Sequence, residues 1–265
     1  FKGEPYGLHT RVFINSEGLP TYEAKDVGLI MQKWRDYSFD QSIIITGNDI
    51  LEYMKVVQKS IEQFEPELVR RSIHLTHGNL KLAGGKKMSS RKGTVLLALD
   101  VLEAAREAQA SAHDTQNEPV VLGAVKYAFL ANRVGGDIVY DPDTSVSLHG
   151  NSGPYLQYAH ARARSIVAKS DKQAVRPATF IGGERELIRK LAQSAEVVER
   201  AAEELMPHLV CTYLYELAQV FNRFYEQSRI IGDEREAERL YLVERYASTL
   251  RSGLGLLGID APERL

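Results

Sequence analysis

A short loop rich in glycine, lysine and serine carries residue types that could bind phosphate. Residues 84–94 read GGKKMSSRKGT and place four cations and two serine hydroxyls in the seven positions from Lys86 to Lys92. Lysine and arginine supply charge to a polyphosphate, while hydroxyls and free backbone N–H groups supply directed donors. A solvated basic loop is the alternative, because charge runs are commonly just exposed to water.

A tyrosine and an aspartate lie on one face of a predicted helix near the start of the chain. Thr21 is expected to cap this helix over residues 22–37, in which Tyr22 and Asp26 stand four residues apart. A carboxylate beside a phenol suits a guanidinium, because the acid accepts charge-assisted hydrogen bonds and the ring offers a cation–π face. The alternative for Asp26 is a solvated surface acid.

Aromatic and cationic residues alternate in the second half of the chain. Tyr155, Tyr158 and Arg162 lie at i, i+3 and i+7 of a helix that Pro154 begins. The stretch 162–176 adds further cations, five in all against one acid. Rings that stack on unpaired bases and cations that pair with phosphates are what single-stranded RNA recognition needs. Alternatively, the tyrosines pack into a helix seam that Arg162 covers.

The first half of the chain predicts a parallel sheet. Short strands are expected at 11–14, 42–46 and 72–75. A helix at 50–64 joins the last two, which makes a βαβ unit, and the isoleucine run of 42–46 is typical of a strand buried on both faces. Ligands of such sheets bind beyond the carboxyl ends of the strands, here at Gly47, Asn48, Asp49 and the turn at His77 and Gly78.

The second half predicts helices that pack as a bundle. The expected elements are an extended segment at 94–99, helices at 100–110, 118–132, 154 onward, 184–205, 207–228 and 235–257, and a polar connector at 137–150. Apolar residues in the last two helices step by three and four, which indicates a core seam. Gly258 is expected to end the final helix.

Composition narrows the class of protein. The chain has 265 residues, 26% of them charged and 44% hydrophobic, which is typical of one large or two ordinary globular domains. A net charge of −2 argues against non-specific coating of nucleic acid. The single Cys211 fits a reducing compartment, no apolar run is long enough to span a bilayer, and His74 with His77 lacks the further ligands of a metal site.

Five segments resemble arginyl-tRNA synthetases and occur in the order of that family. They are residues 21–28 (TYEAKDVG), the isoleucine strand at 42–46, residues 87–94 (KMSSRKGT), residues 153–162 (GPYLQYAHAR) and residues 256–265 (LLGIDAPERL). The KMSSR sequence resembles the KMSKS signature of class I synthetases, and the block at 153–162 is specific to the arginine family. The resemblance implies a partial Rossmann-type α/β sheet followed by an all-α, helical-bundle anticodon-binding domain. The implied domains are 1–117, a connecting helix and linker at 118–152, and 153–265.

The resemblance also implies roles for individual residues. Tyr22 and Asp26 match the positions that hold the arginine guanidinium, and Lys87, Met88, Ser89, Ser90 and Arg91 match the flexible loop that closes over ATP, with Lys87 directed at its phosphates. The residues that match or adjoin the adenylate region are Gly47, Asn48, Asp49 and His77. Those that match tRNA contacts are Tyr155, Tyr158, Arg162, Tyr225 and Leu265. The implied partners are arginine tRNA, L-arginine and ATP with Mg²⁺ as substrate, without a prosthetic group or a membrane, in a cytoplasmic enzyme that is monomeric at full length.

The chain departs from the family pattern at several points. Ser90 stands where the class has a second lysine, Leu265 stands where methionine is common, and residues 48–50 stand where the family often carries a glutamine after the Gly47 position. The HIGH signature, whose histidines stabilise the adenylate transition state, does not occur, and the chain opens on Phe1. We therefore expect a C-terminal portion that is inactive alone. A non-catalytic tRNA-anticodon-binding module and a different class I synthetase are the alternatives.

Overall fold

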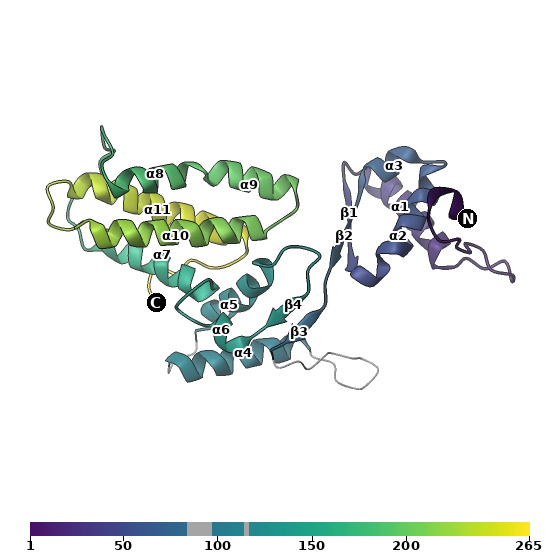
Figure 1. Ribbon diagram of the computed structural model, residues 1–265, viewed down its shortest axis with the longest axis horizontal. Coiled ribbons are helices and arrows are strands. Elements are labelled where there is room, and N and C mark those ends of the chain that lie inside the picture. Colours follow the sequence, from purple (N-terminus) through teal and green to yellow (C-terminus); the bar gives the residue numbers. More distant parts are fainter. Residues whose placement is uncertain (84–96, 114–116) are drawn as a thin grey trace. The chain divides into compact units, whose positions relative to one another are not determined.

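The computed structural model describes residues 1–83, 97–113 and 117–265, and the chain divides into two compact units (Figure 1). Unit 1 comprises Phe1–Asn79 with Val134–Asp137, and unit 2 comprises Leu80–Arg133 with Ile138–Leu265. The basic loop, including Lys87, Met88, Ser89, Ser90 and Arg91, lies outside the described residues, as do residues 94–96 of the extended segment expected at 94–99. The end of that segment was predicted wrongly, because Ala98 and Leu99 already belong to the helix that follows.

Unit 1 is a small parallel sheet with helices packed against it. Its strands are β1 (Ser42–Gly47) and β2 (Ser72–His77), and its helices are α1 (Tyr22–Tyr37), α2 (Leu51–Glu62) and α3 (Pro66–Arg70), with 3₁₀ turns at Glu4–Tyr6 and Asn48–Ile50. The strands pair in parallel from Ser42 opposite Ser72 to Gly47 opposite His77. The three helices bury a core of Ile30, Val57, Ile61 and Leu68. The predicted βαβ unit and its parallel pairing are confirmed.

Two predictions for unit 1 are wrong. Ile43 and Ile45 of β1 are 40% and 67% exposed, so the strand is not buried on both faces. Alternate residues of a strand point to opposite faces, and in the described residues α1–α3 cover only one of them. Residues 11–14 form only an isolated bridge from Ile14 to Pro20, because the Asn15 side chain accepts from the N–H groups of Glu17 and Leu19 and makes a tight turn.

The helix cap at Thr21 also differs from expectation. Thr21 does precede α1, but its hydroxyl accepts no hydrogen bond from the first turn of the helix. The hydroxyl lies within hydrogen-bond distance of the carbonyl oxygens of Val12 and Phe13, at 2.7 and 3.1 Å, and thereby ties the N-terminal segment to the start of α1.

Unit 2 begins with a second two-stranded parallel sheet, in which β3 (Leu80–Leu82) pairs with β4 (Ile138–Tyr140). The helices α4 (Ala98–His113), α5 (Glu118–Leu130) and α6 (Pro142–Ser145) accompany it. Their shared core includes Val101, Val121, Tyr140 and Val146. Residues 137–150 are therefore not a plain connector, since Ile138–Tyr140 joins the sheet and places the Tyr140 ring in the core.

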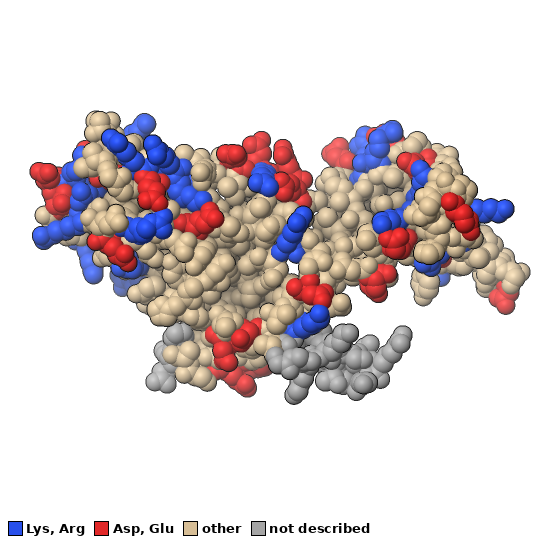
Figure 2. Space-filling view, viewed as in Figure 1, with Lys and Arg blue, Asp and Glu red and all other residues tan. Residues whose placement is uncertain are grey.

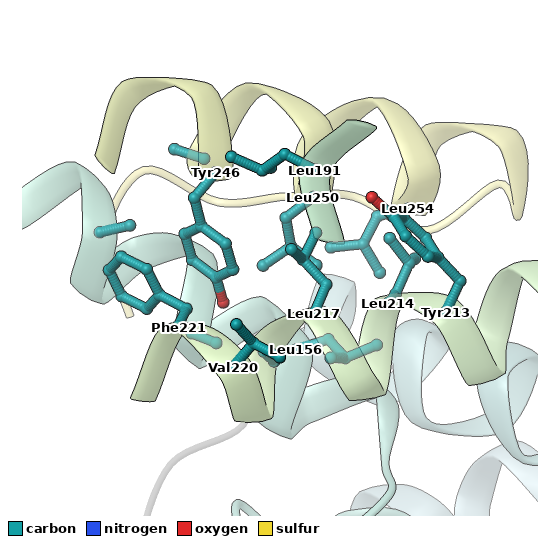
Figure 3. Close-up of a cluster of buried hydrophobic side chains, with 14 of the residues drawn as sticks. Leu156, Leu191, Tyr213, Leu214, Leu217, Val220, Phe221, Tyr246, Leu250 and Leu254 are labelled. Carbon is teal, nitrogen blue, oxygen red and sulfur yellow. The ribbon is translucent and has the colours of Figure 1, made fainter. Parts of the chain in front are cut away.

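The rest of unit 2 is a helical bundle of α7 (Gly153–Ala168), α8 (Gly183–Ala192), α9 (Ser194–Glu203), α10 (His208–Gln227) and α11 (Glu236–Leu256). The predicted seams are confirmed: Figure 3 shows Leu217 and Phe221 of α10 facing Tyr246 and Leu250 of α11, all fully buried. The Phe221 and Tyr246 rings stack at 3.8 Å. The single helix predicted at 184–205 is wrong, because Gln193 closes α8 with an N–H to Lys190 carbonyl bond and α9 begins afresh.

The end of the chain is held against α7. Gly258, with φ +66°, ends α11 as predicted. The Gln157 amide then donates to the Asp260 carbonyl at 2.8 Å, the His160 Nδ1 lies 2.9 Å from the Pro262 carbonyl, and Arg164 pairs with Glu263 at 2.5 Å. These contacts fix the path of the segment that ends at Leu265.

Candidate functional site

A pocket of about 570 Å³ lies within unit 1, between α1, α2 and the inner face of the sheet. Its size falls within the usual range for small-molecule sites. Tyr22 and Asp26, the pair predicted from their spacing, both line it. Tyr22 stands at the start of α1 and is 78% exposed, with Lys25 Nζ 5.3 Å from the centre of its ring.

Three further polar side chains in the pocket contact one another or Asp26. The Tyr53 hydroxyl donates to Asp26 Oδ2 at 2.5 Å. Arg11 reaches Glu23 at 3.4 Å, and its guanidinium carbon lies 5.5 Å from the centre of the Tyr53 ring. The sequence reasoning missed Arg11, Glu23 and Tyr53, because they come from three different segments and no local motif links them.

Asp26 differs from Glu23 in its electrostatic partners. Among the residues that the structure describes, no lysine, arginine or histidine lies within ion-pair distance of Asp26, whereas Glu23 has Arg11. A partly buried carboxylate without a protein cation favours a cationic ligand, since an ion pair offsets the loss of its hydration. The pocket can therefore accept a positively charged group at Asp26.

The residues predicted beyond the carboxyl ends of the strands lie together at one end of the sheet. Gly47 and His77 are opposite each other in the ladder. Asn48 donates to the Gly135 carbonyl at 3.0 Å, and the Asp49 carboxylate lies so close that a Cβ on Gly47 would meet its Oδ1 at 2.6 Å. None of these four residues lines the 570 Å³ pocket, which instead takes Thr46 and Ile50 from this region. Thr46 lies 2.7 Å from His74, and burial lowers the pKa of His74.

The second group of predicted residues surrounds an arginine stacked on a tyrosine in unit 2. The guanidinium carbon of Arg162, on α7, lies 4.4 Å from the centre of the Tyr225 ring on α10. Tyr155 is half-buried, packs edge-on against Tyr215 at 5.8 Å and accepts from Asn222 at 2.8 Å. Tyr155 thus packs in a helix seam. From the sequence, this was the alternative to RNA contact for both Tyr155 and Tyr158.

The remaining predicted residues of this group are exposed. Tyr158 is 44% exposed and Leu265 is 49% exposed. Of the cations downstream of Arg162, Arg164 pairs with Glu263 and Lys172 with Glu236, so these two are partly neutralised within the protein. Figure 2 shows Lys and Arg side chains gathered over the α7–α11 bundle and interspersed with acids. The surface is mixed in sign, so any RNA contact there depends on particular side chains.

Within residues 1–83, 97–113 and 117–265, no group of three or more His, Cys, Asp or Glu side chains is placed to hold a metal ion. No helix in the same residues combines the length and the apolar composition that crossing a membrane requires.

Comparison with known proteins gives matches along nearly the whole chain. Residues 3–146 match the family model for the catalytic domain of class I tRNA synthetases (R), and residues 156–265 match the DALR anticodon binding domain. The arginine–tRNA ligase of Bacteroides thetaiotaomicron is 30% identical over 98% of this chain and 47% of its own length. That of Porphyromonas gingivalis is 31% identical over the same shares. The chain spans about half the length of the curated relatives it matches.

Solved structures agree with this fold. The arginyl-tRNA synthetase of Thermus thermophilus superposes with a TM-score of 0.83 at 28% identity, over 96% of this chain and 51% of that one. The methionyl-tRNA synthetase of Mycobacterium tuberculosis, at 18% identity and a TM-score of 0.56 over 84% of this chain and 42% of that one, shares the fold alone.

Proposed function

This chain belongs to the arginyl-tRNA synthetase family, and from that premise we propose that its parent protein activates L-arginine with ATP and transfers the arginyl group to the 3′ end of arginine tRNA. The observation that carries the proposal is the Asp26 carboxylate, which lines a pocket of about 570 Å³ and has no cation partner in the described part of the chain. A ligand guanidinium at Asp26 would supply that charge, with Tyr22 beside it. The parent enzyme is proposed to be a cytoplasmic monomer.

The nucleotide part of the proposal rests on the strand ends and the basic loop. Gly47 and His77 are neighbours at the end of the sheet, where ligands of parallel sheets bind, and Asn48 and Asp49 follow directly. We assign this edge to the adenylate. Lys87 and Arg91, with Met88, Ser89 and Ser90, form the proposed class I loop, whose cations would stabilise charge on the departing pyrophosphate. Mg²⁺ enters with the ATP phosphates as part of the substrate.

The tRNA part of the proposal rests on the Arg162–Tyr225 pair. The Tyr225 ring is half-buried, with Arg162 over it and the Phe221 ring 6.4 Å away, so an unpaired base would stack on the exposed part of the ring and on the guanidinium plane, and the cation would stay close to the backbone phosphates. Tyr158 and Leu265 are exposed and available for contact, and Tyr155 supports α10 through Asn222. We propose that Arg162, Tyr225, Tyr158 and Leu265 contact the anticodon loop, while Tyr155 holds α10 in place beside them.

Equilibrium binding of arginine tRNA and a non-cognate tRNA, at two salt concentrations, tests this role. Loss of one base stack in Tyr225→Ala should weaken cognate binding roughly 5- to 150-fold, since stacking contributes about 1–3 kcal/mol per base. The control is Tyr241→Ala, because Arg245 lies over Tyr241 at 5.1 Å and forms a matched pair on α11. Salt-sensitive binding that ignores tRNA identity and Tyr225 would leave only phosphate attraction and would refute the assignment.

A non-catalytic tRNA-binding module is the second candidate, and the match of residues 156–265 to the DALR anticodon binding domain is the observation that favours it. Arginine-dependent ATP–pyrophosphate exchange, measured with tRNA present, separates the two. We expect no exchange by this chain alone and exchange when a HIGH-containing segment of a relative is joined to it. Exchange by the chain alone would show that the HIGH histidines are dispensable. No exchange by the joined protein would favour the binding module.

A further inference from the structure

The two acids of the unit 1 pocket, Glu23 and Asp26, have different partners in the protein. Glu23 is buried and has its own guanidinium, that of Arg11 at 3.4 Å. Asp26 has a phenol instead, the Tyr53 hydroxyl, which donates to Oδ2 at 2.5 Å. Glu23 is therefore already paired with a cation. Among the described residues Asp26 has no such partner, so a cation that neutralises its charge would have to come from a ligand.

Tyr53 is built into the wall of the pocket. It lies on α2 and packs against the core of Ile30, Val57, Ile61 and Leu68, so its ring has little freedom. Burial, the hydrogen bond to Asp26 and the negative charges of Asp26 and Glu23 raise the pKa of Tyr53. The phenol therefore keeps its proton at neutral pH, and Asp26 accepts that proton in a hydrogen bond.

We propose that Tyr53 is a positioning residue for recognition of the arginine side chain. Its hydroxyl holds Asp26 through Oδ2 and leaves Oδ1 as the acceptor for the guanidinium. This inference rests on the proposed function, because it takes arginine as the ligand of the pocket. Residues 48–50 do not supply a polar contact to Asp26, because Asn48 and Asp49 do not line the pocket and Ile50 has a hydrocarbon side chain; α2 supplies that contact through Tyr53.

The test is calorimetric binding of L-arginine and of L-citrulline, its neutral analogue, to the 265-residue chain. Tyr53→Phe keeps the ring and its packing but removes the hydroxyl. Since hydrogen bonds to charged groups are the stronger class, arginine affinity should fall about tenfold or more. Citrulline affinity should change less than about threefold, because the uncharged urea depends less on an oriented carboxylate. Tyr37→Phe, at the exposed end of α1, is the matched control and should change neither.

The outcomes distinguish the positioning role of Tyr53 from the proposed arginine site itself. A selective loss of arginine binding in Tyr53→Phe, together with complete loss in Asp26→Asn, supports the positioning role. Equal weakening of arginine and citrulline would show a loosened pocket wall and would overturn it. Unchanged arginine binding in Tyr53→Phe, with loss in Asp26→Asn, would overturn the role of Tyr53 and leave the arginine site standing. A folded wild-type chain that binds tRNA but no arginine would overturn both.

Discussion

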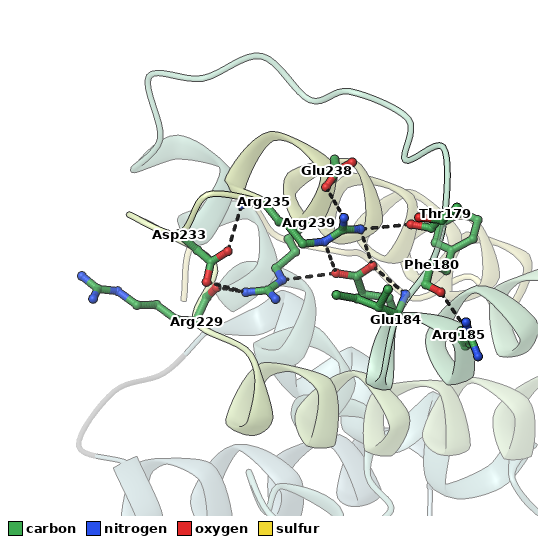
Figure 4. A network of polar contacts seen from close by, with 10 residues as sticks. Thr179, Phe180, Glu184, Arg185, Arg229, Asp233, Arg235, Glu238 and Arg239 are labelled. Carbon is green, nitrogen blue, oxygen red and sulfur yellow. Dashed lines mark hydrogen bonds and ion pairs between the residues drawn. The ribbon is translucent and has the colours of Figure 1, made fainter.

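Replacing Glu184 with glutamine should destabilise the helical bundle by about 2 kcal/mol at neutral pH. The Glu184 side chain is 2% exposed and lies at the start of α8 (Figure 4). Arg235 contacts both of its oxygens, at 2.8 and 3.1 Å, and Arg239 adds a third contact at 3.3 Å. Breaking a fully buried ion pair costs ~3–5 kcal/mol. The cost here is smaller because Arg235 keeps Glu238, Arg239 keeps Asp233, and solvent reaches the arginines.

The same network gives the Glu184→Gln variant a distinct pH dependence. Burial alone would raise the pKa of Glu184, but hydrogen bonds from Arg235, the Ile181 N–H and Arg239 outweigh it and lower the pKa below the ordinary 4.5. A carboxylate with a lowered folded-state pKa contributes its stability above the unfolded-state value and loses it as pH falls through the folded-state value. The glutamine variant has no titrating group at position 184, so it does not lose this stability as pH falls. The difference in unfolding free energy between the two proteins should therefore be constant above about pH 6 and shrink below pH 4.5.

Urea unfolding followed by far-ultraviolet circular dichroism, at several pH values from 7 to 3, measures both effects. Trp34, the only tryptophan, lies in unit 1, so its fluorescence gives an internal reference for a unit that the substitution does not touch. Glu186→Gln is the control, because Glu186 is exposed on the same helix and its pair with Arg223 is a surface one, worth less than ~1 kcal/mol. Parallel stability curves down to pH 3, or equal losses in the two variants, would refute the reasoning.

Two further predictions concern close packing and a buried hydroxyl. Gly153→Ala should lower stability by about 1–3 kcal/mol, because its Cβ would lie 2.3 Å from the Gly123 carbonyl oxygen. Gly255→Ala, in open space on α11, should raise stability by about 0.5–1 kcal/mol. Thermal unfolding compares the two variants, and equal changes in their midpoint temperatures would contradict the close contact at Gly153. Tyr246→Phe should be neutral or stabilising in urea unfolding, because the buried Tyr246 hydroxyl finds no partner among the described residues. Tyr127→Phe should cost about 1 kcal/mol, because that hydroxyl bonds Asn151 and Cys211, and a loss as large in Tyr246→Phe would refute the contrast.

Elements with strong periodicity could be predicted from the sequence. The seams of α10 and α11 follow from apolar residues spaced by three and four, and Phe221 and Leu250 of those seams are buried as expected. Tyr246, which stacks on Phe221, was not part of the predicted seam. The parallel pairing of β1 and β2 follows from the βαβ order. The exposed face of β1 could not be predicted, because an isoleucine run shows that a strand is apolar but not which of its faces a neighbouring element covers.

The pocket shows a similar limit. The four-residue spacing of Tyr22 and Asp26 was enough to place them on one helix face and in one pocket. Tyr53 is 27 residues from Asp26 in the sequence, and the hydrogen bond that joins them depends on how α2 crosses α1. Packing of two helices decides such contacts, and a single sequence carries no local signal for them.

The block at 153–162 is dense in large polar residues because α7 uses two opposite faces. At 100° per residue, Tyr155, Tyr158 and Arg162 fall within about 60° of one another. Gln157, His160 and Arg164 fall on the other side, where the structure shows them holding the segment from Asp260 to Glu263.

Both faces converge on the proposed RNA contact. The first face carries Arg162 against Tyr225, and the second fixes the path of the segment whose last residue is Leu265. A change at His160 would therefore alter RNA binding without touching RNA, by releasing the segment that positions Leu265. On this helix a residue can therefore affect RNA binding without lying at the proposed RNA site. Substitutions on the two faces of α7 distinguish direct contact from this indirect effect.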